Sequence, residues 1–276
     1  MMKRPRRKKR HYWPIIVCTL LILIGLGLIL TPHFYSQFVQ RRYQAEVTVY
    51  KKHARVTSKH TQQLRAYNKA LARGRVTALP LTQQEQSHII AYVTIPRIKL
   101  RNQPVYYGAD STTLAHGVGV LPGTSLPIGG RSTLSVISGH SGFNNQIIFD
   151  HIKELRAGDR FYVTALGQPR HTYQVYKQLV VAPSGKKALA PIRIQKNKDI
   201  MVLLTCTPIF INSKRLLVFA KRVTAPSSST AQQQGQQGAG YAKPYRYLLI
   251  GGVLIIIVIG GLIIVRRIRK TTGKQS

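Results

Sequence analysis

Residues 199–222, DIMVLLTCTPIFINSKRLLVFAKR, decide the fold of this chain. Two apolar runs within them, DIMVLLT and RLLVFAKR, have the composition of β-strands. Pro208 follows the first run and ends its ladder, because proline has no N–H to donate. Consecutive strands joined by a short loop can pair side by side. The stretch therefore predicts two neighbouring strands, with Cys206 at the end of the first and Arg215 at the start of the second.

Short runs of the same composition begin at Ile89 and are separated by Gly, Pro and Asp. They read IIAYVTI, QPVYY, STLSVIS, RFYVTAL and HTYQVYKQLVVA. One stretch, FDHIKELRAGD, interrupts them and predicts a helical turn that leads into a corner at Gly158 and Asp159. Many short strands with turn residues between them predict an all-β domain, either a barrel or a sandwich, over residues 89–223.

The flanks of this domain differ from it in character. Residues 36–75 carry good helix formers and end near Gly74, a residue type that caps helices. Residues 31–88 are therefore expected to form a helical stalk. After Val223 the sequence APSSSTAQQQGQQGAG lacks periodicity and is too polar to bury a core. Residues 224–246 are therefore expected to be a flexible tether.

Two uncharged apolar runs predict membrane helices at residues 14–30 and 247–265. The first would be about 26 Å long as a helix, close to the roughly 30 Å of a bilayer core. Basic flanks are retained in the cytoplasm, so the tails at residues 1–13 and 266–276 are expected inside and the β domain outside the cytoplasmic membrane. The alternative for the first run is a cleaved signal peptide, but TPHFYSQF follows it rather than an A-x-A site.

The chain is strongly basic, with 42 Lys and Arg against 7 Asp and Glu and a formal net charge of +35. Seven basic residues lie in 1–13 and six in 244–276, which leaves the outside segment at +22. A place outside the membrane argues against nucleic acid as the partner. It favours anionic lipid headgroups or acidic wall polymers. A generic solvated surface without a specific partner is the alternative.

Cys206 is the only thiol outside the expected membrane segments, because Cys18 lies within the first apolar run. A lone exported cysteine is a buried bystander, an intermolecular staple or a reactive nucleophile. The strand-end position and the basic surroundings favour a reactive thiolate. A cysteine nucleophile needs a base or an imidazolium partner. His140, in the small-residue loop SGHSGF, is placed best of the nine histidines, with His116 second. Spacing alone leaves both pairings open, and it leaves Arg215 open as a surface cation.

Residues 202–208, VLLTCTP, resemble the sortase signature TLxTCTP, with Val202 in place of its first threonine. Further blocks follow the order found in class C, or pilus-type, sortases. They are GVGVLPGTSLPIGG, TLSVISGH, FDHIKELRAGDRFYV and INSKRLLVFAKR. The likeness covers about residues 66–222, and a second membrane span is typical of the class. By this resemblance the chain is identified as a class C sortase, a cysteine transpeptidase.

The resemblance implies an eight-stranded β-barrel and a triad of His140, Cys206 and Arg215. In that family, typical of Gram-positive bacteria, the thiolate attacks the Thr-Gly bond of an LPxTG-like sorting signal, and an amine resolves the thioacyl enzyme. Cys206 would be the nucleophile and His140 the general acid and base. Arg215 would bind the substrate backbone and the developing oxyanion. The residues expected to line the substrate groove are Ser138, Thr205 and Thr207.

Two departures from the family pattern bear on the groove. Ser141 stands where the family often has an arginine directly after the histidine. Residues 72–90, which begin ARGRVTALPLTQQEQSHI, lack the Asp-Pro-aromatic motif of the lid that plugs the groove of pilus sortases. An open groove without self-occlusion is therefore expected.

Three functions follow as hypotheses. The leading one is polymerisation of LPxTG-bearing pilin subunits onto a pilin lysine, and the alternative is attachment of LPxTG-bearing surface proteins to a cell-wall peptide amine. The third is a non-catalytic basic membrane scaffold that binds acidic wall polymers. An L,D-transpeptidase is set aside because Thr205 fills the place of the glycine that precedes its cysteine. No metal or cofactor is expected, since the outside segment lacks grouped Cys, His and carboxylates at ligand spacing.

Overall fold

The computed structural model describes residues 13–53, 56–142, 148–185, 190–209 and 211–224. The chain divides into one compact unit over Met1–Ala231 and a second over Gln232–Ser276. The second unit lies outside the described residues, and so do the expected tether from residue 225 onward and the expected span at 247–265.

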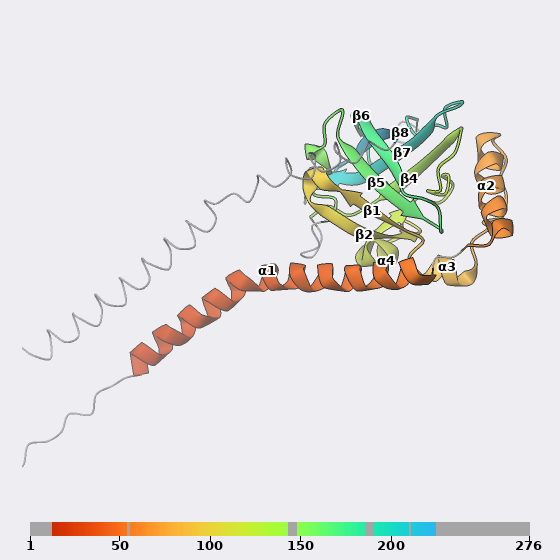
Figure 1. Cartoon of the computed structure of the whole chain (residues 1–276). Coiled ribbons are helices and arrows are strands. Elements are labelled where there is room, and N and C mark those ends of the chain that lie inside the picture. Colours follow the sequence, from red (N-terminus) through yellow and green to blue (C-terminus); the bar gives the residue numbers. More distant parts are fainter. Residues whose placement is uncertain (1–12, 54–55, 143–147, 186–189, 210, 225–276) are drawn as a thin grey trace, which may run out of the picture. The chain divides into compact units, whose positions relative to one another are not determined.

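Eight strands close into a barrel in the order β1-β2-β3-β4-β7-β8-β6-β5 (Figure 1). Their bounds are β1 Ala91–Ile95, β2 Leu100–Tyr107, β3 Val118–Val120, β4 Thr133–Ser138, β5 Arg160–Ala165, β6 His171–Val181, β7 Asp199–Thr207 and β8 Lys214–Val223. The pairs β2–β3 and β4–β7 are parallel, and the other pairs are antiparallel. The barrel, rather than the sandwich, is thus the form that the all-β pattern takes.

Alternation along the strands sends one set of side chains into the barrel and the other outward. In β7, Met201 and Leu203 belong to the cluster that fills the barrel, whereas Ile200 and Val202 belong to a second cluster on the outer face of β4, β7 and β8. Both faces of β7 are apolar because it is covered on both sides, as expected of a strand in a parallel pair. Ile192 and Ile194, from the connection between β6 and β7, pack against the outer cluster.

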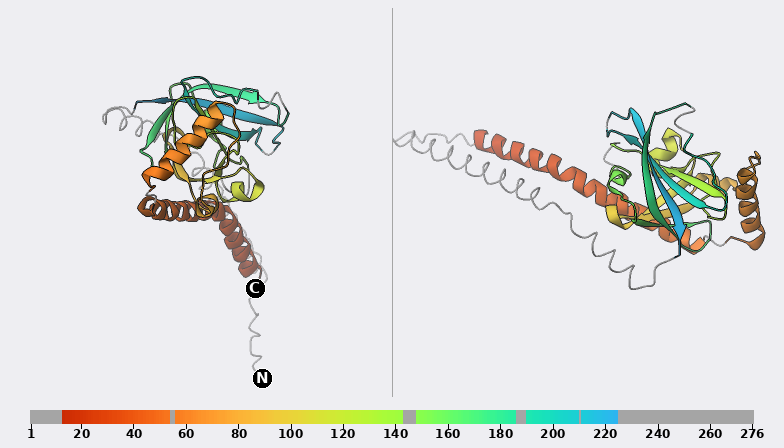
Figure 2. Two further views of the ribbon diagram at one scale, coloured as in Figure 1. Left: turned by 90° about the vertical axis from the view of Figure 1, so that its right-hand side faces the viewer. Right: turned by 90° about the horizontal axis from the view of Figure 1, so that it is seen from above.

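The helices lie on the side of β1 and β2 and at one end of the barrel. They are α1 Trp13–His53, α2 Ser58–Ala72, α3 Gln83–Ser87 and α4 Ser111–His116, with short 3-10 turns η1 Pro96–Ile98 and η2 Ile152–Glu154. Leu64 and Tyr67 of α2 belong to the cluster inside the barrel, so α2 closes that end (Figure 2). Thr57 caps α2 by accepting a hydrogen bond from the backbone of His60.

The last part of α1 is bonded to the barrel. Tyr43 donates its hydroxyl to the carbonyl of His116 at 3.0 Å. Tyr50 donates to the carbonyl of Ile90 at 2.7 Å and accepts from the backbone N–H of Leu166 at 2.6 Å. These bonds fix α1 beside β2, the strand that it contacts most.

The predicted elements are found with two differences. The helical stretch at 36–75 forms α1 and α2 rather than one helix, and Gly74, at φ 69°, directly follows the second. The strand β3 corresponds to no predicted run, because three residues with a central glycine carry too little pattern. The helical turn predicted in FDHIKELRAGD is η2.

Within the described ranges, no helix is both long enough and apolar enough to cross a membrane. The span expected at residues 14–30, which falls within α1, stays a prediction.

Candidate active site

Cys206 and Arg215 face each other across the pair β7–β8. Their Cα atoms are register partners in this antiparallel pair, and the side chains of directly opposed residues lie on the same face, with Cβ atoms about 5 Å apart. Counting along β7 by twos leads from Cys206 to Leu204, which packs against the outer apolar cluster, and then to Val202, which belongs to it. The thiol and the guanidinium therefore share the outer face of the barrel, and Cys206 is a free, half-buried cysteine.

His140 follows β4, which runs parallel to β7 with Ser138 opposite Leu204. The backbone N–H of Gly139 donates to the carbonyl of Leu204 at 3.0 Å. Thr205 donates its hydroxyl back to the carbonyl of Gly139 at 2.7 Å. This exchange fixes the residue before His140 against the strand that carries Cys206.

Two more hydrogen bonds hold the chain on the other side of His140. Ser141 donates its hydroxyl to the carbonyl of Cys206 at 2.7 Å. Gly142 donates its N–H to the carboxylate of Asp150 at 2.8 Å. The serine that replaces the usual arginine of this loop thus connects the histidine loop to the backbone of the cysteine itself.

His140 and Arg215 lie in different surroundings. Burial lowers the pKa of His140 below its ordinary value, so the imidazole is neutral at neutral pH for most of the time. Arg215 donates from Nη1 to the carbonyls of Asn212 at 3.0 Å and Lys214 at 3.1 Å. The guanidinium is thereby held at the loop end of the β7–β8 pair, beside Cys206.

The three expected groove residues lie in different settings. Ser138 is buried next to Leu204 and stands in line with Val136 of the outer cluster. Thr205 is 3% exposed and its hydroxyl is used by Gly139, so its visible contact positions the histidine loop. Thr207 is the last residue of β7 and lies opposite Lys214.

The alternative histidine, His116, belongs to another part of the molecule. It ends α4, its Nδ1 lies 2.8 Å from the carbonyl of Thr112, and its own carbonyl accepts from Tyr43 of α1. Of the two histidines considered, the structure brings His140 and not His116 to the end of β7.

Gly139 is packed too tightly for any side chain. A Cβ there would lie 2.7 Å from the ring of Phe149 and 2.8 Å from Val118. The sequence loop SGHSGF predicted close approach at the histidine, but not that Phe149 and the hydroxyls of Thr205 and Ser141 position it. These contacts join segments far apart in the chain, and no local pattern indicates them.

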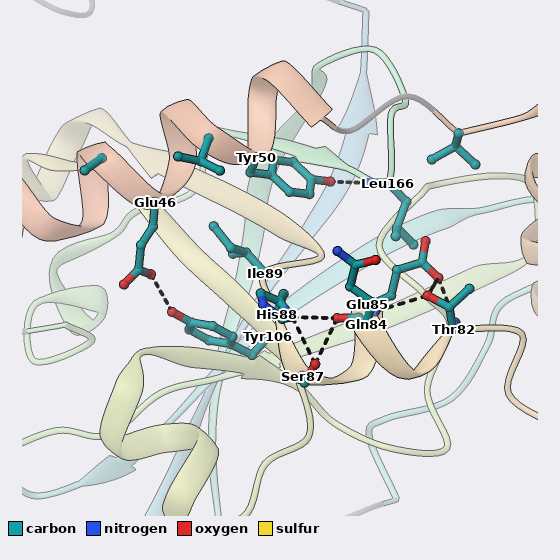
Figure 3. Close-up of a pocket in the computed structure, with 13 residues that line it drawn as sticks. Glu46, Tyr50, Thr82, Gln84, Glu85, Ser87, His88, Ile89, Tyr106 and Leu166 are labelled. Carbon is teal, nitrogen blue, oxygen red and sulfur yellow. Dashed lines mark hydrogen bonds between the residues drawn. The ribbon is translucent and has the colours of Figure 1, made fainter.

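The region of the missing lid motif is engaged elsewhere. The described hydrogen bonds of residues 75–90 include bonds to α1, α2, β2 and Leu166, and Leu81 packs in the barrel core. Between this segment and α1 lies a cavity of about 800 Å³, where Glu46 accepts from the hydroxyl of Tyr106 (Figure 3). Its lining residues include neither Cys206 nor Arg215.

In the part of the chain that the structure describes, no group of three or more His, Cys, Asp and Glu side chains converges as metal ligands would. The chemistry available at the end of β7 is that of a thiol, an imidazole and a guanidinium above an apolar face.

Comparison with known proteins assigns the class. The sortase domain family matches residues 93–223. Sortase C1 of GBS pilus island 1 is 34% identical over 67% of this chain and 94% of its own, with a TM-score of 0.58. A Clostridium perfringens sortase C, solved with the C-terminal cell wall sorting motif, is 34% identical over 66% of this chain and 99% of its own, at 0.59. Sortase C-1 from Actinomyces oris is 38% identical over 61% and 99%, at 0.52. No curated protein matches the sequence.

A closed barrel with this degree of identity to solved sortases defines a cysteine transpeptidase, and the chain belongs to the sortase family. Within the family it is a sortase of class C, the pilus type, as the sequence blocks predicted. Because this family consists of cysteine transpeptidases, the hypothesis of a non-catalytic scaffold is set aside.

Proposed function

We propose that the chain cleaves an LPxTG-like sorting signal between Thr and Gly and transfers the threonyl group to an amine, with Cys206, His140 and Arg215 as the catalytic residues. The observation that carries the proposal is the set of contacts that the end of β7 makes with β8 and with the loop after β4. Cys206 lies opposite Arg215, and the residues on both sides of His140 are hydrogen-bonded to Leu204, Thr205 and Cys206.

In the first half-reaction the proton of the Cys206 thiol passes to neutral His140, and the thiolate attacks the carbonyl carbon of the substrate threonine. The negative charge passes to the carbonyl oxygen, where the guanidinium of Arg215 stabilises it. The C–N bond then breaks, and the imidazolium of His140 gives its proton to the departing glycine amine. The products of this step are a thioester on Cys206 and a free amino terminus.

In the second half-reaction an amine attacks the thioester carbonyl. His140, now neutral, removes the proton from the attacking nitrogen, the C–S bond breaks and the thiolate returns. One amide bond is exchanged for another, so no oxidant or cofactor is required. The lowered pKa of His140 favours the neutral form that this step needs.

Partly buried apolar side chains on the outer side of β4, β7 and β8 support a substrate with apolar residues ahead of the scissile bond. Leu204, two residues before Cys206, is one of them, and it packs against the buried cluster that contains Val136 and Val202. The leucine and proline of an LPxTG-like signal have the chemistry to bind such a face. The solved Clostridium relative carries a cell wall sorting motif.

For the acceptor, we propose the lysine amine of a pilin subunit. The similarity to pilus-type enzymes supports isopeptide polymerisation. The absent lid motif, with residues 75–90 engaged by α1, α2 and β2, leaves attachment to a cell-wall peptide as the competing outcome. We also propose that the barrel lies outside the cytoplasmic membrane between anchors at residues 14–30 and 247–265. Basic residues precede the first apolar run and follow the second, and such flanks stay in the cytoplasm.

The test uses the full-length chain in a non-ionic detergent with an LPxTG peptide. A thioacyl adduct is expected on Cys206 by intact mass, and none on the Cys206→Ala variant. With a pilin-lysine peptide and a wall-peptide amine offered together, the lysine product is expected to dominate. A folded enzyme that forms no adduct with any LPxTG variant contradicts the substrate assignment, and a dominant wall-peptide product replaces polymerisation with anchoring.

A further inference from the structure

Two basic hollows adjoin at the end of the barrel where β4 and β7 begin. The first, about 470 Å³, lies between α2 and residues 129–133, and its cations are Arg65, Lys69, Arg73 and Arg131. The second, about 700 Å³, lies at the starts of β6 and β7, and its cations are Arg170, Lys198, Lys221 and Arg222. Among the lining residues of both, Asp199 is the only acid. We call these two hollows together the basic end.

The single carboxylate of the basic end is used internally. Asp199 accepts from the N–H of Gly130 at 2.8 Å and from Nη1 of Arg222 at 3.3 Å. It also accepts from the hydroxyls of Tyr173 at 3.0 Å and Thr133 at 3.2 Å. These bonds form the partition between the two hollows, since Gly130 and Thr133 line the first and Asp199 lines the second. The other seven cations are exposed at the rim, and no carboxylate that lines the hollows balances them.

A buried imidazole at this partition has an unused polar atom. His171 is 6% exposed, and its Nδ1 has no hydrogen-bond partner in the described structure. Nearly all buried polar side-chain atoms are hydrogen-bonded. The backbone passes so close that a Cβ on Gly129 would lie 2.8 Å from Nδ1 of His171, Nη1 of Arg222 and Oδ2 of Asp199. Nδ1 itself is out of a ligand's reach, so what the two hollows present to a ligand is the positive charge of their exposed cations, which suits an anion.

We propose that the basic end binds an acidic polymer with repeating phosphodiester groups, one phosphate over each hollow. A flexible chain can follow two hollows separated by a ridge, whereas a flat lipid surface meets only the rim. Neither hollow is lined by Phe, Tyr or Trp. The basic end therefore lacks the aromatic side chains on which nucleic-acid bases stack. The excess positive charge of the outside segment, which transpeptidation leaves unexplained, thereby gains a partner of defined chemistry.

The basic end lies at the opposite end of the strands from the proposed catalytic residues. Asp199 begins β7 and Cys206 is its next-to-last residue, and a strand advances about 3.3 Å per residue, which separates them by about 23 Å. A polymer bound at the basic end would hold the enzyme at its site of work and leave the substrate groove open.

The test measures binding of a fluorescent poly(glycerol phosphate) oligomer to the full-length Cys206→Ala chain in a non-ionic detergent, so that catalysis plays no part. The first variant removes four cations of the basic end, with Arg65→Gln, Lys69→Gln, Arg131→Gln and Lys198→Gln. The control removes four exposed cations elsewhere on the barrel, with Arg97→Gln, Arg101→Gln, Lys153→Gln and Arg156→Gln.

The basic-end variant is expected to bind at least tenfold more weakly at 150 mM salt. The slope of log K against log salt should fall by at most about 1.4, from about 0.7 for each of the two phosphate contacts. The control should stay within about threefold of the parent. A variant with only Arg65→Gln, Lys69→Gln and Arg131→Gln gives a smaller slope change in the same direction and serves if the fourfold variant unfolds.

Three results would overturn the proposal. One is equal weakening by the basic-end and control variants, which would mean diffuse attraction. Another is binding to vesicles with 30% phosphatidylglycerol but not to the oligomer, which would assign the basic end to a lipid surface. The third is equal affinity for polyglutamate of matched charge, which would remove the preference for phosphate. None of them depends on the LPxTG assignment.

Discussion

Replacing Thr205 by valine should slow the enzyme by removing one hydroxyl and keeping the shape of the side chain. The hydroxyl donates to the carbonyl of Gly139 at 2.7 Å from a residue that is 3% exposed. Leaving a buried carbonyl without its donor costs about 1–3 kcal/mol. At about 1.4 kcal/mol for each factor of ten, full transmission of that cost to the transition state lowers kcat/KM by about 5- to 150-fold.

The matched control is Thr205→Ser, which keeps the hydroxyl and loses a methyl group worth about 0.8 kcal/mol. Two assays separate positioning from stability. Cleavage of a quenched LPxTG peptide gives kcat/KM, and iodoacetamide alkylation of Cys206 at pH 7 reports the thiolate and its imidazole partner without a substrate. The serine variant is expected to be less stable yet within about twofold of the parent rate, and the valine variant slow in both assays.

The reasoning fails if Thr205→Val keeps the parent kcat/KM and alkylation rate while its unfolding free energy drops. That pattern would mean that the bond to Gly139 supports the fold and that His140 finds its place without it. A loss in kcat/KM for the serine variant equal to that of the valine variant would point to the methyl group instead.

Three further predictions follow. Arg215→Lys keeps the charge and loses the planar fork of donors, and kcat for the quenched peptide should fall by about 10²-fold, whereas an unchanged kcat would remove Arg215 from oxyanion stabilisation. Tyr50→Phe removes the hydroxyl bonds to Ile90 and Leu166 and leaves the backbone bond between these two residues in place, so urea unfolding should show a loss of about 0.5–1.5 kcal/mol with kcat unaltered, and a parent-like midpoint would contradict the structure. Burial, and after it the charge of Arg222, lowers the pKa of His171. The unfolded chain therefore binds more protons, and the free energy of unfolding falls as pH drops below about 6.5, by at most about 1.4 kcal/mol per pH unit for one group. His171→Asn should flatten this fall between pH 7.5 and 5.5, and an unchanged slope would show that His171 titrates normally.

Local pattern predicted most of the barrel and stopped where pairing is nonlocal. Seven strands are visible as β-branched or aromatic runs between turn residues. The exception, β3, spans Val118–Val120 and owes its place to parallel pairing with β2 and antiparallel pairing with β4. Its three residues contain no alternation to detect, so the count of eight rested on the resemblance to sortases.

The proposed site divides in the same way. The pairing of Cys206 with Arg215 follows from two consecutive strands and a short loop, which sequence reasoning can anticipate. The place of His140 depends on β4 lying parallel to β7, although more than sixty residues separate the bonded segments, as the bond from Thr205 to Gly139 illustrates. Ser141 looked like a departure from the family, and its hydroxyl bond to the carbonyl of Cys206 becomes visible only in three dimensions.

The attachment of α1 to the barrel decides where a soluble fragment of this enzyme should begin. A fragment that starts at Ser58 would discard Val47, which is 1% exposed, together with Tyr43 and Tyr50. The underlying face of β2 would then meet water, and the bonded backbone pair of Ile90 and Leu166 would lose the hydroxyl of Tyr50. A start just ahead of Arg41 keeps these contacts of Tyr43, Val47 and Tyr50 and omits the apolar run at 14–30. Recombinant work should therefore treat the end of α1 as part of the catalytic domain rather than as its stalk.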